Sequence, residues 1–200
     1  MVFKNRLSFF LIVHFLFYFI SEKIVHAQLP EMKNSAIASE WIERRGQLFF
    51  LNGQGIHTVS LFKIQVYKIS LFLEKRSKFP EEIITSAAKK IILLKFLRDL
   101  GAAQLRLAFS DGFYENCAIH CQTLKPYLED LNSKISDMKE GDSLEFQFFE
   151  NRVIFNSSVG SYFEVKNPNF GRILLSIWLG SSPPSALLKE NLLGISGSLK

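Results

Sequence analysis

Three residues in the middle of the 200-residue sequence have side chains that commonly bind metal ions. Cys117, His120 and Cys121 are spaced i, i+3 and i+4, which places them on one face of a helix. A structural zinc site needs four ligands and the sequence offers no second cluster, so we predict no metal site. We interpret the cysteines as free thiols packed on a sheet. A disulfide between them is the alternative, although it is sterically awkward within one helix.

A second candidate is the glycine-rich stretch Gly53-Gln54-Gly55, which resembles the start of a phosphate-binding loop. A phosphate loop leads directly into a helix, whereas here apolar strand-like residues lie on both sides. Asn52-Gly53 is also the strongest short hairpin signal. We therefore predict a turn at Asn52-Gly53 and no cofactor.

Arg98 and Asp99 follow an apolar run and precede a helical pattern. Aspartate is a favoured residue at the start of a helix, where its carboxylate accepts from free backbone N–H groups. We therefore interpret Asp99 as a helix N-cap and Arg98 as its structural neighbour.

These residues must be positioned by an alternation of strands and helices. Apolar patterns predict strands at 47–51, 59–73, 90–97, 143–149 and 152–156. Helices are expected at 81–88, 102–121, 124–135 and 169–179, with a last one ending near residue 193. The 59–73 run changes phase twice, which predicts bulges that curve the sheet. The fold class is α+β, with helices layered on an antiparallel sheet.

The N-terminus predicts export. Lys4 and Arg6 precede an apolar run over residues 7–20, and Ala27 ends a short polar stretch. This is the layout of a secretory signal peptide, and the run is shorter than the roughly 20 residues that a membrane span needs. We predict a signal peptide at 1–27, a lead-in at 28–46, one domain at 47–195 and a tail at 196–200. The exported protein would be periplasmic; a retained N-terminal anchor is the alternative.

Composition limits the partners. The net charge is +5 with both signs interspersed, so no basic stripe suggests nucleic-acid binding. The 20 phenylalanines suit a packed core and also an apolar ligand cavity. We expect a small apolar ligand as partner and no stable membrane span after signal removal, and the sequence leaves the oligomeric state open.

Five sequence blocks occur in an order that resembles the bacterial, exported branch of the chalcone isomerase-like family. They are LNGQGIHT (51–58) with the strand that follows, FLRD (96–99), DGFYENC (111–117), KEGD (139–142) and IWLGSSPPSALLKENLLG (177–194). The resemblance implies an open-faced β-sandwich, in which a large curved antiparallel sheet and a layer of helices enclose an apolar cleft. Its enzymes close the flavanone ring of a chalcone, and non-enzymatic members hold a fatty-acid carboxylate.

The resemblance also implies five site positions. The family's anion-binding arginine falls on His57, a threonine falls on Tyr67, and a tyrosine falls on Phe109. The family's asparagine is retained as Asn116, and a further threonine falls on Ile177. We therefore expect ligand binding at His57, Tyr67, Phe109 and Asn116. No catalytic residue can be assigned with four of the five positions substituted.

The substitutions remove electrostatic groups from the site. Arginine is permanently charged and presents a planar fork of donors, whereas histidine has a pKa of about 6.5 and is mostly neutral at neutral pH. Phe109 has no hydroxyl group, so the chalcone reaction would lack two of its main stabilising groups. The alternative interpretation is that His57 is an ordinary polar residue of a strand. An arginine from elsewhere, such as Arg106 or Arg172, would restore anion binding if it lined an open cleft.

Three functional interpretations follow. The first is an exported protein that binds a small apolar or fatty-acid-like ligand in the cleft without chalcone-to-flavanone activity. The second is an intramolecular lyase or isomerase that uses His57, Tyr67 and Asn116 on another substrate. The third is a non-catalytic structural protein of the envelope, whose cleft is filled by side chains.

Overall fold

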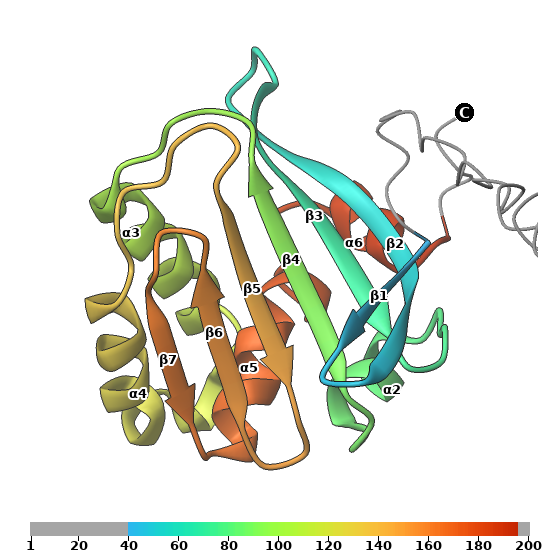
Figure 1. The fold of residues 1–200 in the computed structure, drawn as a ribbon. Helices are drawn as coiled ribbons and strands as arrows, with labels where there is room; N and C mark the ends of the chain where they lie inside the picture. Colours follow the sequence, from blue (N-terminus) through green and yellow to red (C-terminus); the bar gives the residue numbers. More distant parts are fainter. Residues whose placement is uncertain (1–39, 196–200) are drawn as a thin grey trace, which may run out of the picture. The chain divides into compact units, whose positions relative to one another are not determined.

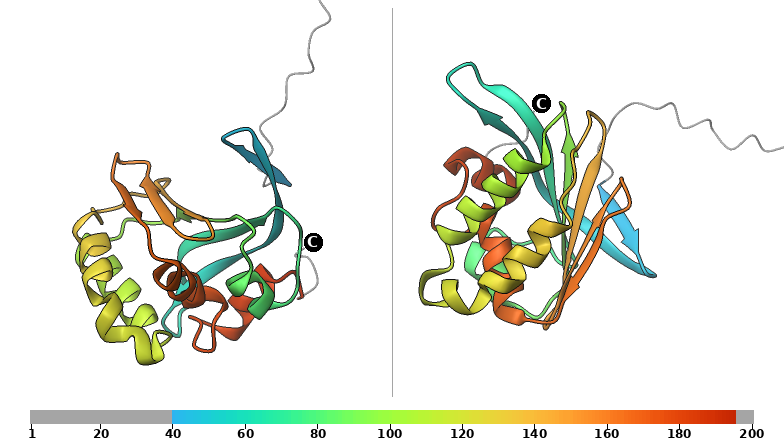
Figure 2. Two further views of the ribbon diagram at one scale, coloured as in Figure 1. Left: turned by 90° about the horizontal axis from the view of Figure 1, so that it is seen from below. Right: turned by 90° about the vertical axis from the view of Figure 1, so that its left-hand side faces the viewer.

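A computed structural model describes residues 40–195, which form one antiparallel sheet covered by helices on one face (Figures 1 and 2). The predicted signal peptide, its cleavage after Ala27 and the tail at 196–200 lie outside the described residues. The seven strands follow the order β1-β2-β3-β4-β5-β6-β7, so each strand pairs with its neighbours in sequence. The predicted α+β class, with a curved antiparallel sheet and a helical layer, is confirmed.

The elements in chain order are β1 (Trp41–Arg44), β2 (Gln47–Val59), β3 (Ile64–Leu73), α2 (Pro80–Thr85), β4 (Lys90–Phe96), α3 (Ala102–Tyr114), the 3-10 helix η1 (Ala118–His120), α4 (Cys121–Ser133), β5 (Ser143–Phe148), β6 (Val153–Ser157), β7 (Tyr162–Val165), α5 (Pro168–Leu179) and α6 (Ala186–Leu192).

The turn predicted at Asn52-Gly53 is wrong, because both residues lie inside the long strand β2. The register of β2 against β3 shifts twice: Asn52 is an extra residue in β2, and Val66 is an extra residue in β3 between Tyr67 and Gln65. One bulge therefore lies within the predicted run 59–73, and the other lies before it in β2. The Asn52 amide donates to the Ser77 and Leu192 carbonyls at 2.9 and 2.8 Å. The Asn-Gly pair thus makes a bulge on which the end of α6 rests.

The core lies between the sheet and the helices. Alternate residues of β4 and β5 point inward, as half-buried strands require. Trp178 of α5 contacts Phe146 and Phe109 with ring centroids 5.8 and 6.0 Å apart. Eight residues of α5 are buried, so this helix is the centre of the helical layer.

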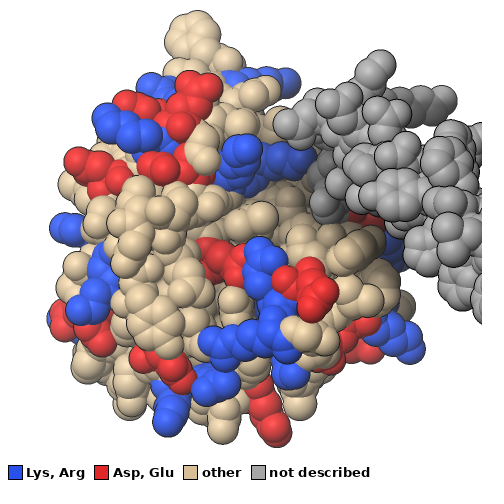
Figure 3. Space-filling view, in the orientation of Figure 1, with Lys and Arg blue, Asp and Glu red and all other residues tan. Residues whose placement is uncertain are grey.

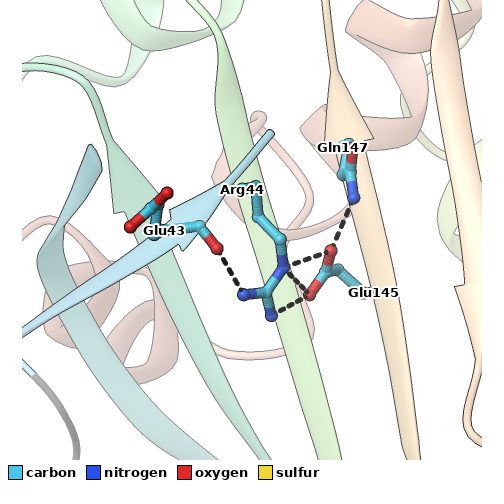
Figure 4. Close-up of polar contacts among 4 residues, drawn as sticks. All are labelled: Glu43, Arg44, Glu145 and Gln147. Atoms are coloured by element: carbon cyan, nitrogen blue, oxygen red, sulfur yellow. Dashed lines mark hydrogen bonds and ion pairs between the residues drawn. The ribbon is translucent and has the colours of Figure 1, made fainter. Parts of the chain in front are cut away.

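On the other face of the sheet, the β1–β2 hairpin reaches across to β5 (Figure 4). Arg44 donates from Nε and Nη2 to the Glu145 carboxylate at 3.0 and 2.6 Å, and Gln147 donates to the same carboxylate at 2.7 Å. Phe49, Phe72 and Ile91 form a small apolar cluster on this face. β1 lies in the segment that the sequence suggested was a lead-in, and it completes the sheet.

The helix predicted at 102–121 is wrong in its second half. α3 ends at Tyr114, and Ala118 has a positive φ of 45°, which turns the chain before α4. Cys117 and Cys121 therefore do not share one helix, and their Cα atoms, 5.0 Å apart, are joined by a disulfide. The interpretation of two free cysteines is corrected.

The predicted N-cap role of Asp99 is also wrong. Gly101 holds the N-cap position of α3. The Asp99 carboxylate instead accepts from Lys139 Nζ at 2.9 Å and from the Glu140 backbone N–H at 3.0 Å. Asp99 therefore joins the β4–α3 loop to the loop before β5.

Lys90, at the start of β4, is a buried cation that makes stability depend on pH. It is 4% exposed, and its Nζ donates to the Ser86 and Ala88 carbonyls at 2.7 Å each. Burial lowers the pKa of Lys90 from 10.5 to about 8. The negative charge of Glu74 opposes this shift, and the positive charge of Arg172 adds to it. Between these values the unfolded chain binds more protons than the folded one, so the free energy of unfolding rises with pH.

We expect this rise to be roughly 1–2 kcal/mol between about pH 8 and pH 9.5, since one proton contributes at most about 1.4 kcal/mol for each pH unit. Urea unfolding at several pH values measures it. Lys90→Met should remove the rise, whereas Lys95→Met, an exposed residue of the same strand, should keep it. An identical pH dependence in both variants would contradict the assignment to Lys90.

Candidate functional site

An open cavity of about 620 Å³ lies between the sheet and helices α3 and α5. Its size falls in the range of about 300–1,000 Å³ that is typical of small-molecule sites. The walls come from β2, β3, β4, α3, α5 and two connecting loops. The lining residues that bear on its chemistry are His57, Val59, Val66, Tyr67, Leu94, Arg98, Asp99, Leu105, Ala108, Phe109, Asp111, Glu115, Ile177, Trp178 and Ser182.

Four of the five site positions predicted from the resemblance meet at this cavity: His57, Tyr67, Phe109 and Ile177. His57 and Tyr67 are cross-strand partners of β2 and β3, and their rings stack with centroids 4.9 Å apart. Phe109 and Ile177 form part of the wall but do not fill the space. The filled cleft required by the structural-protein interpretation is therefore not present.

Tyr67 is a buried residue in the lining of the cavity. Trp178 Nε1 donates to the Tyr67 hydroxyl at 3.3 Å. Burial raises the pKa of Tyr67 to about 12, while the Trp178 hydrogen bond opposes the rise. The phenol therefore stays protonated at neutral pH. Its own O–H has no acceptor among residues 40–195, so it can donate to a ligand oxygen.

His57 does not supply a positive charge. Burial lowers its pKa below the ordinary value of 6.5, so the imidazole is neutral at neutral pH. It can offer one N–H donor and one acceptor to a ligand. A cation for an anionic ligand must come from another residue.

That cation is Arg98, which the sequence interpretation treated as structural. It is exposed at the end of β4 and is the one Lys or Arg in the lining of the cavity described here. Arg106 instead donates to the Ile135 carbonyl at 2.6 Å, and Arg172 borders a different, smaller hollow. One feature of the sequence could have indicated this role of Arg98: it comes shortly after the buried strand β4, in the FLRD block.

Charge is divided between the two ends of the cavity. Arg98 lies in the loop before the N-terminal end of α3. The Ala102 N–H at that helix end already donates to the Asp137 carboxylate at 2.7 Å, so the positive charge available to a ligand there is that of Arg98. Asp111 and Glu115 lie at the other end of α3, about 15 Å away by helix geometry. Asp99 faces the Arg98 end but is already paired with Lys139. An anionic group is therefore best accommodated at the Arg98 end.

Asn116, the retained family position, is not among the lining residues. Its amide donates to the Gly112 carbonyl at 2.9 Å and to the Ser182 carbonyl at 3.3 Å. Its own carbonyl accepts from the Ser182 backbone N–H at 3.4 Å. Asn116 thus fastens the α5–α6 linker, which forms one edge of the cavity, to the end of α3.

A second hollow of about 720 Å³ follows the β3–α2 connection. Its lining contains many charged side chains, including Lys75, Arg76, Lys78 and Glu82. This charged lining makes it a weaker candidate site for a largely apolar ligand.

Within residues 40–195 no group of three or more His, Cys, Asp or Glu side chains is arranged to hold a metal ion. In the same stretch, none of the helices has both the length and the apolar character of a transmembrane segment.

Comparison with known proteins gives two matches and one negative result. A family model described as chalcone isomerase-like matches residues 31–194. A fatty-acid binding protein of Arabidopsis thaliana is similar in structure, with a TM-score of 0.62 over 77% of this chain and 96% of that chain. The two are 15% identical in sequence, so the similarity shows the fold alone. A search of curated proteins finds no match.

Proposed function

Because the chain belongs to the chalcone isomerase-like family, we propose that it binds a fatty acid or a similar acidic amphiphile in the cavity beside His57 and Tyr67. The observation that carries this proposal is the open apolar cavity with a single cation, Arg98, at one end. The plant protein of the same fold binds fatty acids, which supports the same ligand class here.

The ligand's apolar chain would lie against Val66, Leu94, Leu105, Phe109 and Trp178. Burial of a methylene group contributes about 0.8 kcal/mol, so a long chain can bind tightly through this wall alone. The carboxylate would lie near Arg98, the one cation in the lining of the cavity among the described residues. The Tyr67 hydroxyl can donate to one of its oxygens.

The same groups argue against ring-closing catalysis of the chalcone type. A neutral His57 cannot hold a phenolate as a permanent cation does, and Phe109 offers no hydroxyl. Tyr67, with a pKa of about 12, cannot act as a base at neutral pH. Binding without turnover is therefore the function that this site supports best.

The place of action is the periplasm of a bacterium, after export through the segment at 1–27. The apolar run at 7–20 and the Cys117–Cys121 disulfide both support export, since disulfides persist in oxidising compartments. Mass spectrometry of the N-terminus of protein from its native host tests this; a mature chain beginning at Gln28 is expected.

Filling the cavity should prevent ligand binding. Ala108 lies in the wall on α3, and Ala108→Trp places an indole in the space that the ligand would occupy. We expect the affinity for laurate to fall by about a hundredfold or more, because most of the buried apolar contact is lost. Displacement of a fluorescent fatty acid by laurate measures it.

Ala103→Trp is the matched control, because Ala103 is exposed on the same helix and is not among the lining residues. It should leave the affinity for laurate unchanged. Equal affinities in the two tryptophan variants would place the ligand elsewhere.

Lipid extracted from protein purified from its native host should contain an acidic amphiphile.

A further inference from the structure

The turn between β2 and β3 presents two apolar side chains to solvent. Leu61 is 98% exposed and Phe62 is 87% exposed. The hairpin that carries them extends past the other strands of the sheet (Figures 1 and 2). In the space-filling view, uncharged atoms project at the end of the domain where this hairpin lies (Figure 3).

The turn holds this arrangement through its own backbone. The Lys63 N–H donates to the Ser60 carbonyl at 3.2 Å, and the Phe62 N–H donates to Ser60 Oγ at 3.3 Å. Ser60 and Lys63 have positive φ values of 66° and 50°. Leu61 and Phe62 are therefore fixed at the corner of a closed turn, where polar residues and glycine are usual.

Two partly exposed apolar residues widen this surface. Val59 and Ile64 are partners across the hairpin, directly below the turn, and are 43% and 39% exposed. Val59, Leu61, Phe62 and Ile64 together are called the apolar tip. Isolated exposed apolar residues are ordinary, but a contiguous group at a projecting end marks an interaction site.

The charged residues of the hairpin that carries the apolar tip are all basic, although acidic side chains also lie below it at this end of the domain (Figure 3). The sequence from Arg44 to Leu73 contains no Asp or Glu, and it carries Lys63 in the turn and Lys68 on β3. Lys68 lies opposite Lys95 of β4, so their charges add on one face of the sheet. Apolar side chains bordered by lysines fit a membrane surface that contains anionic lipid.

We propose that the apolar tip inserts into the surface of a membrane rich in anionic lipid. Val59 lines the ligand cavity as well as the tip, so the docked protein would hold the mouth of the cavity near the lipid. Four side chains are too few for a stable dimer, which needs about 1,200–2,000 Å² of buried surface. The docking does not depend on which ligand the cavity holds, and it would explain how a lipid-derived ligand reaches the cavity.

A probe next to the tip tests the insertion in the full chain. Gln65→Cys adds one thiol on an exposed position of the hairpin, and Cys117 and Cys121 are already paired. The thiol is labelled with an environment-sensitive fluorophore and mixed with vesicles of phosphatidylcholine and phosphatidylglycerol that carry a lipid-borne quencher. We expect the lipid-borne quencher to reduce the fluorescence of this probe. With vesicles of phosphatidylcholine alone, the half-saturating lipid concentration should be about tenfold higher.

The deciding comparison is the same probe in the L61S/F62S background. We expect the half-saturating lipid concentration to rise by about tenfold or more, because both deeply inserting side chains are lost. I119S/L187S, which removes two exposed apolar side chains from η1 and α6, should leave it unchanged. A probe at Asp130→Cys on α4, away from the hairpin in Figure 1, should stay unquenched.

Any attraction of the N-terminal residues to the vesicles is the same in all these variants, so it cannot produce the difference. Equal quenching with and without Leu61 and Phe62 would overturn the proposal. A second result would also overturn the proposal: L61S/F62S changes its oligomeric state, measured by light scattering, while its vesicle binding is unchanged. The tip would then bind a second copy of the chain. Laurate affinity of L61S/F62S, measured without vesicles, should equal that of the wild type whatever the vesicle result.

Discussion

Gly53→Ala is expected to lower the free energy of unfolding by about 3 kcal/mol. A Cβ atom at Gly53 would lie 2.5 Å from the Leu192 carbonyl oxygen and 2.7 Å from its carbon, and closer still to the Asn191 carbonyl oxygen. These are backbone atoms at the end of α6, so no change of rotamer can relieve the contact. The whole end of α6 would have to move off β2, and with it the Asn52 hydrogen bond to the Leu192 carbonyl.

Gly171→Ala is the matched control. Gly171 lies within α5, and its added Cβ would meet Val153 and Phe148 at 3.9 and 4.0 Å, which is ordinary contact. Alanine favours a helix over glycine by up to about 1 kcal/mol, so this variant should be slightly more stable than the wild type. Chemical denaturation of both variants gives the comparison. If both variants lost a similar amount of unfolding free energy, the close contact between α6 and Gly53 would not be the reason that position 53 requires glycine.

The Gly53 contact also explains one limit of prediction from the sequence. Asn-Gly is a strong hairpin signal because both residues tolerate the backbone of a tight turn. The same tolerance suits a bulge onto which a helix end must pack closely, and nothing local distinguishes the two. The deciding group, the carbonyl of Leu192, lies 139 positions further along the chain. The curved sheet, the helical layer and strands β4, β5 and β6 could be predicted, because apolar periodicity reports burial directly.

The positions of the candidate site were predicted from the family resemblance, and the strand pairing and helix packing explain why four of them meet. His57 and Tyr67 meet because β2 and β3 pair, and Phe109 and Ile177 meet them because α3 and α5 cover that face. The Cys117–Cys121 disulfide was only the alternative prediction, because one continuous helix was expected. In the structure α3 ends at Tyr114 and the chain turns at Ala118, a residue type that rarely adopts positive φ. The role of Arg98 was missed because the direction of a loop side chain depends on tertiary packing.

The second large effect concerns Arg98. Arg98→Gln should weaken the binding of laurate by about tenfold to a hundredfold, since a hydrogen bond to a charged group contributes about 1.5–3 kcal/mol. Binding of dodecanol, which has the same chain and no charge, should change little. Arg172→Gln changes the net charge equally at an exposed position outside the cavity, so it should preserve the affinity for laurate. Isothermal titration with both ligands measures these affinities.

His57→Arg in the Arg98→Gln background asks whether the cavity needs a charge at one particular position. His57 stacks on Tyr67 inside the cavity, so an arginine there would reach the same carboxylate from the β2 side. We expect it to restore at least part of the affinity for laurate and not to change that for dodecanol. If Arg98→Gln weakens both ligands equally, Arg98 shapes the cavity mouth and does not bind the anion. If only laurate is affected and His57→Arg rescues it, the arginine absent from position 57 is replaced in function by Arg98.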